Sequence, residues 1–383
     1  MRILFVHEVS YSLKPVFEYQ EFIDGLLEIG NETALFNFVD GPKPISIERF
    51  SATLPRRLNP RGQILTFTPM ISGSSIVARL MAALTAFVAL PLALIRFKPE
   101  IIVNYSVPTF GLPVVVFSRL LGIPVVFRSI DVSHQIRNTA FSRLVKIWET
   151  LVYVASDHIS THNSSLLDYC VKMGGRRDRT SIDYPPVQDA FFRVGEMDQE
   201  ESRKLFGIGE PSKGTRYLVL GTQFSFSGVD KLVRCFREHG GAGDSLIVIG
   251  GGELETVVDE LARGDGRILS LPFIPFDQVP SALRVADVSL VTFESNLVTN
   301  CALPQRALLS LAAGVPVMSL PLSGLMAEFG DMGVNVVERH EDFFDQTKLS
   351  KNSKPNVQKL WEVISREQSV HHFSKLLMHT AAS

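Results

Sequence analysis

Two glycine-rich segments and one arginine in the second half of the chain have the residue types that bind phosphate groups. Gly221–Phe224 and Gly250–Glu253 each follow a short apolar run directly. Arg306 lies near the start of a predicted helix over Ala302–Ala313, and Glu294 follows the apolar strand before it. Glycine lets a backbone approach a ligand closely, a helix N-terminus presents free N–H groups, and arginine pairs with phosphate. These residues predict a site for an anion such as a diphosphate.

The predicted helix over Ala302–Ala313 has start signals of its own. Thr299 or Asn300 can cap its first N–H groups, and Pro304 stands in its first turn, where a missing N–H costs nothing. Ligand-free interpretations remain open, because a plain crossover between parallel strands, tight glycine turns, a loop glutamate and a solvent-facing arginine would give the same residues. The glycine spacing is not GxGxxG, which excludes a nicotinamide cofactor, and no GxxxxGK[ST] phosphate loop is present.

A second candidate site follows the apolar strand that ends at Arg128. Asp131 or His134, in the loop after it, could take the proton of an acceptor hydroxyl as that hydroxyl attacks a sugar carbon. Local hydrogen bonding between these two side chains is the alternative interpretation. Lys14, in the loop after the first strand, is a further candidate for a phosphate contact.

Alternating apolar strands and helical patterns must position both sites. Such alternation predicts parallel sheets with helices on both faces. The pattern stops at Tyr184-Pro185-Pro186 and starts again at Tyr217, so we place a domain boundary there. The predicted fold class is α/β, with two tandem Rossmann-like, doubly wound domains facing a central cleft. They cover residues 1–186 and 187–365. Residues 366–383 form a helical tail, and its packing on the first domain is left open.

Length and composition agree with this organisation. A chain of 383 residues with 45% hydrophobic residues exceeds one ordinary core. A net charge of −2 argues against nucleic acid as a partner. The three cysteines are far apart in the sequence, which favours a reducing cytoplasm over a disulfide framework or a zinc site. Because Met1 leads directly into a strand, we expect no signal peptide.

Two features bear on contact with a membrane. The uncharged stretch Leu80–Ile95 is shorter than the roughly 20 residues that span a bilayer, and Pro91 interrupts it, so we expect a buried or surface-lying helix. An early loop also concentrates positive charge, which is either simply solvated or attracted to an anionic membrane or acceptor. The arginines of this loop are Arg49, Arg56, Arg57 and Arg61.

Short motifs along nearly the whole chain follow one order. They are Phe22–Thr33, Lys98–Val103 (KPEIIV), Gly122–Val126 (GIPVV), Ala286–Val288 (ADV) and Ala312–Val317 (AAGVPV). In sequence and in order they resemble motifs of the GT-B glycosyltransferases, particularly the family 4-like group. The resemblance implies that a nucleoside-diphosphate sugar lies against the second domain and the acceptor against the first.

By this resemblance the nucleotide base and ribose meet the triple-glycine turn, the Phe273-Ile274 pair and Glu294. The diphosphate meets the backbone at the start of the predicted helix and Arg306. The donor-binding candidates are Thr222, Gln223, Gly250, Gly251, Gly252, Glu253, Phe273, Ile274, Glu294, Cys301, Ala302, Leu303 and Arg306.

The chain also departs from the family pattern. Family members usually carry an arginine and a lysine after the first strand of the second domain, and residues 221–228 contain neither. The two glutamates of the family, eight residues apart, fall on Cys301 and Leu309. Arg306 occupies the place of a lysine found in one subgroup. Either the donor is held differently, or the protein no longer transfers sugar.

The sequence therefore predicts a glycosyltransferase that moves a sugar from a UDP- or GDP-sugar to the hydroxyl of a glycan or lipid-linked acceptor, without a metal or another cofactor. The alternative is a degenerate GT-B protein that acts as a binding or partner subunit of a glycosylation system. The expected location is the cytoplasm, with peripheral contact with the inner face of the membrane left open.

Overall fold

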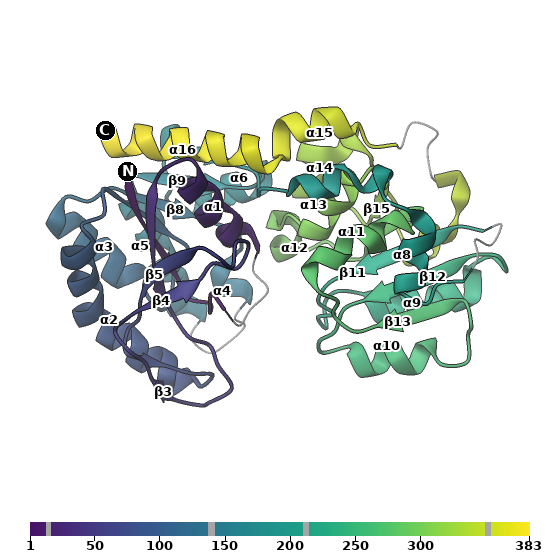
Figure 1. The fold of residues 1–383 in the computed structure, drawn as a ribbon, viewed down its shortest axis with the longest axis horizontal. Helices are drawn as coiled ribbons and strands as arrows, with labels where there is room; N and C mark the ends of the chain where they lie inside the picture. The colour runs from purple at the N-terminus through teal and green to yellow at the C-terminus, as the bar shows by residue number, and fades with distance from the viewer. Residues whose placement is uncertain (13–16, 137–141, 210–213, 349–353) are drawn as a thin grey trace. The chain divides into compact units, whose positions relative to one another are not determined.

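The computed structural model describes residues 1–12, 17–136, 142–209, 214–348 and 354–383 (Figure 1). The chain forms two compact units. Unit 1 comprises Met1–Pro186 and Arg366–Ser383, and unit 2 comprises Val187–Ser365. The first crossing between the units follows Pro186, at the proline pair where neither a helix nor a strand can continue.

Unit 1 contains an eight-stranded sheet in the order β10-β9-β8-β7-β1-β2-β5-β4. All neighbours in it are parallel except β4, which pairs antiparallel with β5. The strands of unit 1 are β1 (Arg2–His7), β2 (Glu32–Asn37), β3 (Ser46–Ile47), β4 (Ser51–Pro55), β5 (Gln63–Phe67), β6 (Ile71–Ser72), β7 (Ile101–Asn104), β8 (Val125–Arg128), β9 (His158–Thr161) and β10 (Thr180–Ile182). Its α-helices are α1 (Phe17–Glu28), α2 (Ile76–Phe97), α3 (Gly111–Leu121), α4 (Ser133–Ile136), α5 (Ser142–Ala155), α6 (Ser164–Lys172) and α16 (Arg366–Ala382).

Helices cover both faces of this sheet because successive side chains of a buried strand point to opposite sides. Ile3 and Phe5 of β1 pack with residues of α1 and α16. Leu4 and Val6 of the same strand pack with residues of α2 and α3. The helix α16, the tail of the chain, is therefore part of the core of unit 1 (Figure 1).

Unit 2 contains a six-stranded parallel sheet in the order β13-β12-β11-β14-β15-β16. Its strands are β11 (Arg216–Leu220), β12 (Ser245–Ile249), β13 (Ile268–Leu271), β14 (Val288–Val291), β15 (Val317–Ser319) and β16 (Val334–Val336). Its α-helices are α7 (Asp189–Phe192), α8 (Gln199–Leu205), α9 (Val229–His239), α10 (Glu255–Ala262), α11 (Val279–Arg284), α12 (Leu297–Cys301), α13 (Gln305–Ala312), α14 (Ser323–Phe329) and α15 (Val357–Ile364). In order of sequence this sheet reads 3-2-1-4-5-6, the Rossmann order. The predicted α/β class with two parallel sheets is confirmed.

The predicted helix over Ala302–Ala313 is wrong at its start. A short helix, α12, ends at Cys301, and α13 begins only at Gln305. Asn296 caps α12 through a capping box with Thr299, so neither Thr299 nor Asn300 caps the longer helix. The capping box at Asn296 starts a separate short helix, α12, before α13. The apolar periodicity alone does not reveal such a cap.

The basic loop predicted around residues 49–61 is also partly wrong. It contains the antiparallel strand β4, and two of its arginines bond within unit 1. The Arg56 Nε atom donates to the Asp24 carboxylate at 2.6 Å. Arg57 donates to the carbonyl oxygens of Tyr11 and Ser12.

Candidate functional site

The strand order of unit 2 reverses between β11 and β14. Open α/β sheets bind ligands at the carboxyl ends of the strands beside such a point. Gly221 follows β11, and Phe293 and Glu294 follow β14. Arg306, in the first turn of α13, reaches the same place, since a Cβ added to Gly221 would lie 3.1 Å from its Nη2 atom. The structure thus brings three separated segments of the predicted site together.

Among the residues that the structure describes, no carboxylate forms an ion pair with the guanidinium of Arg306. Its Nη2 atom donates to the carbonyl oxygen of Thr222 at 3.3 Å, and its central carbon lies 5.0 Å from the centre of the Phe293 ring. Burial lowers the pKa of Arg306 to about 10, with no charged group opposing that shift. Within the described residues its Nη1 atom is buried and has no hydrogen-bond partner. A buried cation of this kind is costly unless an anion joins it, so the position suits a phosphate group.

More buried polar atoms beside Arg306 have no partner. Among the described residues, both side-chain polar atoms of Gln223 lack a hydrogen bond, although Gln223 is only 1% exposed. The same holds for Ser227 Oγ and for His340 Nε2. His340 faces this loop, since a Cβ added to Gly228 would lie 2.9 Å from its Nε2 atom. Because buried polar groups are nearly always hydrogen-bonded, these atoms are available to bond a polar ligand or water.

Gly250 has a structural role in this site. Its φ of +152° lies in a region that other residues rarely adopt, and an added Cβ would collide with the Gly221 carbonyl oxygen. The loops after β11 and β12 are joined by hydrogen bonds from Gly221 N to Ile249 O at 2.8 Å and from Gln223 N to Gly251 O at 2.9 Å. The glycine turn therefore holds the β11 loop in place.

The two residues after Gly251 also support the β11 loop. Gly252 packs against Thr222 and Gln223. The backbone N–H of Ser225 donates to the carboxylate of Glu253 at 2.9 Å. Hydrogen bonds from the side chain and the backbone of Ser225 lower the pKa of Glu253. The helix α10 begins two residues after it, at Glu255. The place of Glu253 in the donor site stays a prediction.

Glu294 already has a partner. Its carboxylate forms an ion pair with Lys231, in the first turn of α9, and this bond lowers the pKa of Glu294. Burial lowers the pKa of the neighbouring His340, partly opposed by the Glu294 charge. The sequence analysis missed Lys231 and His340, because each meets the site only through contacts between distant segments. Half of each Lys231 and Glu294 side chain remains exposed, with values of 55% and 50%.

Residues 301–303, the predicted backbone contacts of the diphosphate, do not form the first turn of α13, and their contact with a diphosphate stays a prediction. Cys301 ends α12 and is buried, which raises the pKa of its thiol to about 11. Ala302 and Leu303 lie in the connection between the two helices. Pro304 provides no side-chain cap for α13. The backbone N–H groups of Gln305 and Arg306 therefore have no partner within the helix.

Aromatic side chains surround the Arg306 position. Phe273 is 55% exposed, and its ring lies 3.3 Å from a Cβ placed on Gly251, while Ile274 is half-buried. The exposed rings of Phe224 and Phe226 stack with centres 5.0 Å apart and planes at 8°. Phe226 in turn lies 6.0 Å from Phe293. The Phe224–Phe226 stack was missed, although its alternate spacing in a glycine-bounded loop is visible in the sequence.

In unit 1, His134 is held by a buried carboxylate. Its Nδ1 atom lies 2.8 Å from Glu149 Oε2 and 3.0 Å from the hydroxyl of Tyr169. Glu149 is fully buried and also accepts the hydroxyl of Tyr153 at 2.9 Å. A histidine oriented by a carboxylate at Nδ1 leaves Nε2 for proton transfer, as a general base requires. The sequence analysis missed Glu149, because it lies inside the next helix, α5.

The other predicted residues of unit 1 are less informative. Asp131 accepts the hydroxyl of Ser133 at 2.9 Å, whereas His134 Nδ1 bonds to Glu149 and Tyr169. Lys14 lies outside the described residues. At the strand reversal of unit 1, between β1 and β7, His7 is buried and stacks on Tyr19 with ring centres 4.3 Å apart. Burial lowers the pKa of His7 to about 4.

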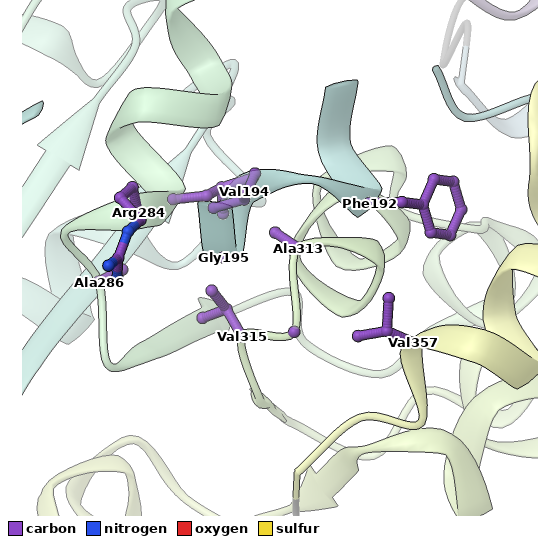
Figure 2. Close-up of a pocket in the computed structure, with 10 residues that line it drawn as sticks. Phe192, Val194, Gly195, Arg284, Ala286, Ala313, Val315 and Val357 are labelled. Atoms are coloured by element: carbon purple, nitrogen blue, oxygen red, sulfur yellow. The ribbon is translucent and has the colours of Figure 1, made fainter. Parts of the chain in front are cut away.

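A pocket with a volume of about 360 Å³ lies in unit 2, but at the opposite edge of its sheet. Its lining includes Leu283, Arg284 and Ala286, before β14, and Ala313–Val315, before β15. These residues lie at the amino ends of the two strands. The side chains around it are mainly apolar (Figure 2). It is therefore separate from the Arg306 position. No group of three or more metal-binding side chains occurs among the described residues.

No protein-family model matches the sequence, and no curated protein sequence matches it. Solved structures do match along the whole chain. Sucrose-phosphate synthase from Thermosynechococcus elongatus gives a TM-score of 0.75 at 13% identity and covers 100% of both chains. A glycosyltransferase from Rickettsia africae also gives 0.75, at 11% identity, over 99% of this chain and 98% of that one. HepE from Anabaena, in complex with UDP, gives 0.68 at 12% identity over 99% of this chain and 100% of that one.

These similarities agree with the strand orders of both sheets. The chain therefore has the two-domain fold of the GT-B glycosyltransferases.

Proposed function

We propose that the protein transfers a sugar from a nucleoside-diphosphate sugar to an acceptor hydroxyl, as a glycosyltransferase of the family 4-like group. The observation that carries the proposal is the buried guanidinium of Arg306, which has no counter-anion among the described residues and lies at the strand reversal of unit 2. The fold supports the proposal but does not decide it, since one fold hosts many reactions.

In this reaction the acceptor oxygen forms a bond to the anomeric carbon of the sugar. The bond from that carbon to the diphosphate oxygen breaks, and the diphosphate leaves with the bonding electrons. Arg306 and the free N–H groups of α13 stabilise the charge that develops on the leaving group. In unit 1, His134 takes the proton of the acceptor hydroxyl, and Glu149 orients it. The step needs no metal ion, so we expect an excess of EDTA to leave the rate unchanged.

For the donor we propose a UDP- or GDP-sugar. The structural relative HepE was solved with UDP, which favours the first of these. The exposed ring of Phe273, beside Gly251, offers a flat face for a nucleotide base. For the acceptor we propose a glycan or a lipid-linked sugar. We place the reaction in the cytoplasm, in keeping with three cysteines that form no disulfide within the described structure.

A partner subunit without transfer activity is the second candidate. It is favoured by Cys301 and Leu309, which are buried at the positions of the family glutamates. The absence of charge in residues 221–228 favours it too. Such a protein would still bind a nucleoside diphosphate at Arg306 but would not consume a sugar nucleotide.

Binding of UDP, GDP and ADP, measured by calorimetry, tests the site. Arg306→Gln should raise the Kd of the preferred nucleotide about 10- to 100-fold, because it removes a charge-assisted contact worth ~1.5–3 kcal/mol. The matched control is Arg263→Gln, which changes an exposed arginine of the same unit and should leave the Kd unchanged. The ligand-free Arg306→Gln protein should unfold at the same temperature as wild type or higher, since an unpaired buried charge is removed.

Two results would contradict the proposal. If no nucleoside diphosphate binds, or if Arg306→Gln binds as tightly as wild type, the anion site is not at Arg306. Turnover of sugar nucleotides, measured as release of the free diphosphate with a glycan or lipid-linked acceptor, separates the two candidates. Nucleotide binding without turnover of any sugar nucleotide would support the partner subunit.

A further inference from the structure

Helix α2 presents its large apolar side chains outward. Most of its buried residues are small. They are Ala78, Ala82, Ala86, Ala89 and Ala93, with Leu90 and Leu94 as the large ones. Its exposed positions hold Ile76, Val77, Leu80, Met81, Leu84, Phe87, Val88, Leu92 and Ile95. A surface helix of a water-soluble domain normally has the opposite arrangement, with large apolar residues inside and polar residues outside. The outward face of α2 is therefore suited to an apolar medium.

This face continues over two neighbouring helices. α2 packs against α3, and α3 packs against α5 (Figure 1). On α3 the exposed large apolar residues are Leu112, Leu120 and Leu121. On α5 they are Leu144, Ile147, Leu151 and Val154. We call these three helices and their exposed apolar residues the α2–α3–α5 face. Contiguous apolar patches on this scale mark interaction sites.

The charges of the α2–α3–α5 face have one sign. The ionisable residues that its three helices expose are Arg96, Arg119, Arg143 and Lys146, and Arg79 is half-buried. The only acidic residue in these helices, Glu149, is fully buried and bonded to His134. Arg79 also pairs with Asp40 at 3.4 Å, so the remaining four carry most of the free charge. Apolar residues bordered by arginine and lysine complement a bilayer of anionic lipids, since the acyl layer takes the former and the head groups the latter.

We propose that the α2–α3–α5 face of unit 1 docks on the surface of an anionic lipid bilayer, with α2 lying along it. Of the described helices, α2 is the one that is long and apolar enough to span a membrane, with 22 residues. It lies on the surface instead, because its alanine face covers Leu4, Val6 and Phe36 of the central sheet. Withdrawing α2 into a bilayer core would expose those residues. Docking does not depend on the donor site, which lies in unit 2.

Flotation of the full-length protein with liposomes tests the proposal. The liposomes contain phosphatidylcholine alone or phosphatidylcholine with about 30% phosphatidylglycerol. This content gives a negative surface charge like that of a natural anionic membrane. Wild-type protein should float with the anionic liposomes. The triple variant Leu80→Gln, Leu84→Gln and Val88→Gln should lower the partition coefficient about tenfold or more, because three exposed apolar side chains no longer insert.

A matched control keeps the number and type of substitutions. It consists of Ile29→Gln, Ile47→Gln and Met378→Gln, which change exposed apolar residues of unit 1 outside the face. The control should float like wild type, and circular dichroism should show that both variants are folded. A second variant, Arg119→Gln with Arg143→Gln and Lys146→Gln, should lose the preference for anionic over neutral liposomes.

Three outcomes would overturn the proposal. The first is wild-type protein that stays at the bottom with both kinds of liposome. The second is self-association, measured by sedimentation, that the α2 variant abolishes while liposomes bind nothing; a second copy would then cover the face. The third is protein in cell membranes that resists a carbonate wash, which would show that α2 spans the bilayer.

Discussion

At the scale of single residues, the proposed anion site depends on one guanidinium, that of Arg306. The segment 221–228 lacks the cations that the family resemblance led us to expect, and Arg306 reaches that segment from the other side of the sheet reversal. Phe293 faces the guanidinium and Gln223 leaves both of its polar atoms unbonded within the described structure. The sequence analysis named Arg306 and Gln223 as candidates, because their positions follow a strand or a helix start. It did not name Lys231 and His340, since only folding brings them near these loops, and it overlooked the Phe224–Phe226 pair, whose spacing the sequence shows.

His134 and Glu149 give the prediction that belongs to this scale. We expect His134→Ala to lower the transfer rate about 100-fold, because the acceptor proton loses its base. Glu149→Gln should also lower the rate, and the double variant should be no slower than His134→Ala, because Glu149 acts only through His134. Steady-state transfer rates of the three variants, with folding checked by circular dichroism, provide the measurement.

Asp131→Asn is the matched comparison, since Asp131 lies in the same loop and bonds to Ser133. It should keep most of the wild-type rate. A full rate in His134→Ala together with a slow Asp131→Asn would exchange the two roles. Full rates in all variants would place the base elsewhere.

At the scale of elements, the loops at the carboxyl edge of the unit 2 sheet are fixed by backbone contacts. The triple glycine after β12 lies so close to the β11 loop that Gly250 leaves no room for a side chain. The sequence predicted a glycine turn at this place and explained its glycines by the close approach of a ligand to the backbone. The structure shows a second reason, which is the contact with the carbonyl of Gly221. In the same way the start of α13 was misplaced, because the cap of α12 at Asn296 interrupts a periodic pattern that otherwise continues.

Gly250→Ala is the prediction for this element. The added methyl group must displace the β11 loop, and the residue must leave a φ of +152° that alanine rarely adopts. We expect the free energy of unfolding of unit 2 to fall by about 2–4 kcal/mol. Gly264→Ala is the control, because Gly264 has a positive φ but open space around it, and should cost only about 1 kcal/mol. Urea denaturation of both variants compares them; equal losses would mean that strain alone, and not the contact with Gly221, explains Gly250.

At the scale of the whole molecule, alternating strand and helix patterns were sufficient to predict two parallel sheets. They were insufficient for β4, whose five residues pair antiparallel beside β5 and carry no apolar periodicity. The tail beyond residue 365 was predicted to be helical, and its packing on the first domain was left open, because no sequence pattern names the residues that it contacts. Arg366 pairs with Glu21 at 2.9 Å, and Phe373 lies 4.4 Å from Phe22, ring centre to ring centre. Unit 1 is thus completed by residues that follow unit 2 in the chain.

This arrangement predicts that damage to the tail unfolds unit 1 and spares the proposed nucleotide site of unit 2. Phe373 is fully buried between α16 and α1, so Phe373→Ala should cost about 3–5 kcal/mol of unit 1 stability. Met378→Ala, on the same helix but 52% exposed, should change it by no more than about 0.5 kcal/mol. Calorimetry of Phe373→Ala should show one unfolding transition moved to lower temperature and a second that the preferred nucleoside diphosphate still raises. A single transition that shifts as one, with and without nucleotide, would show that the two units unfold together, because α16 then ties the stability of unit 2 to that of unit 1.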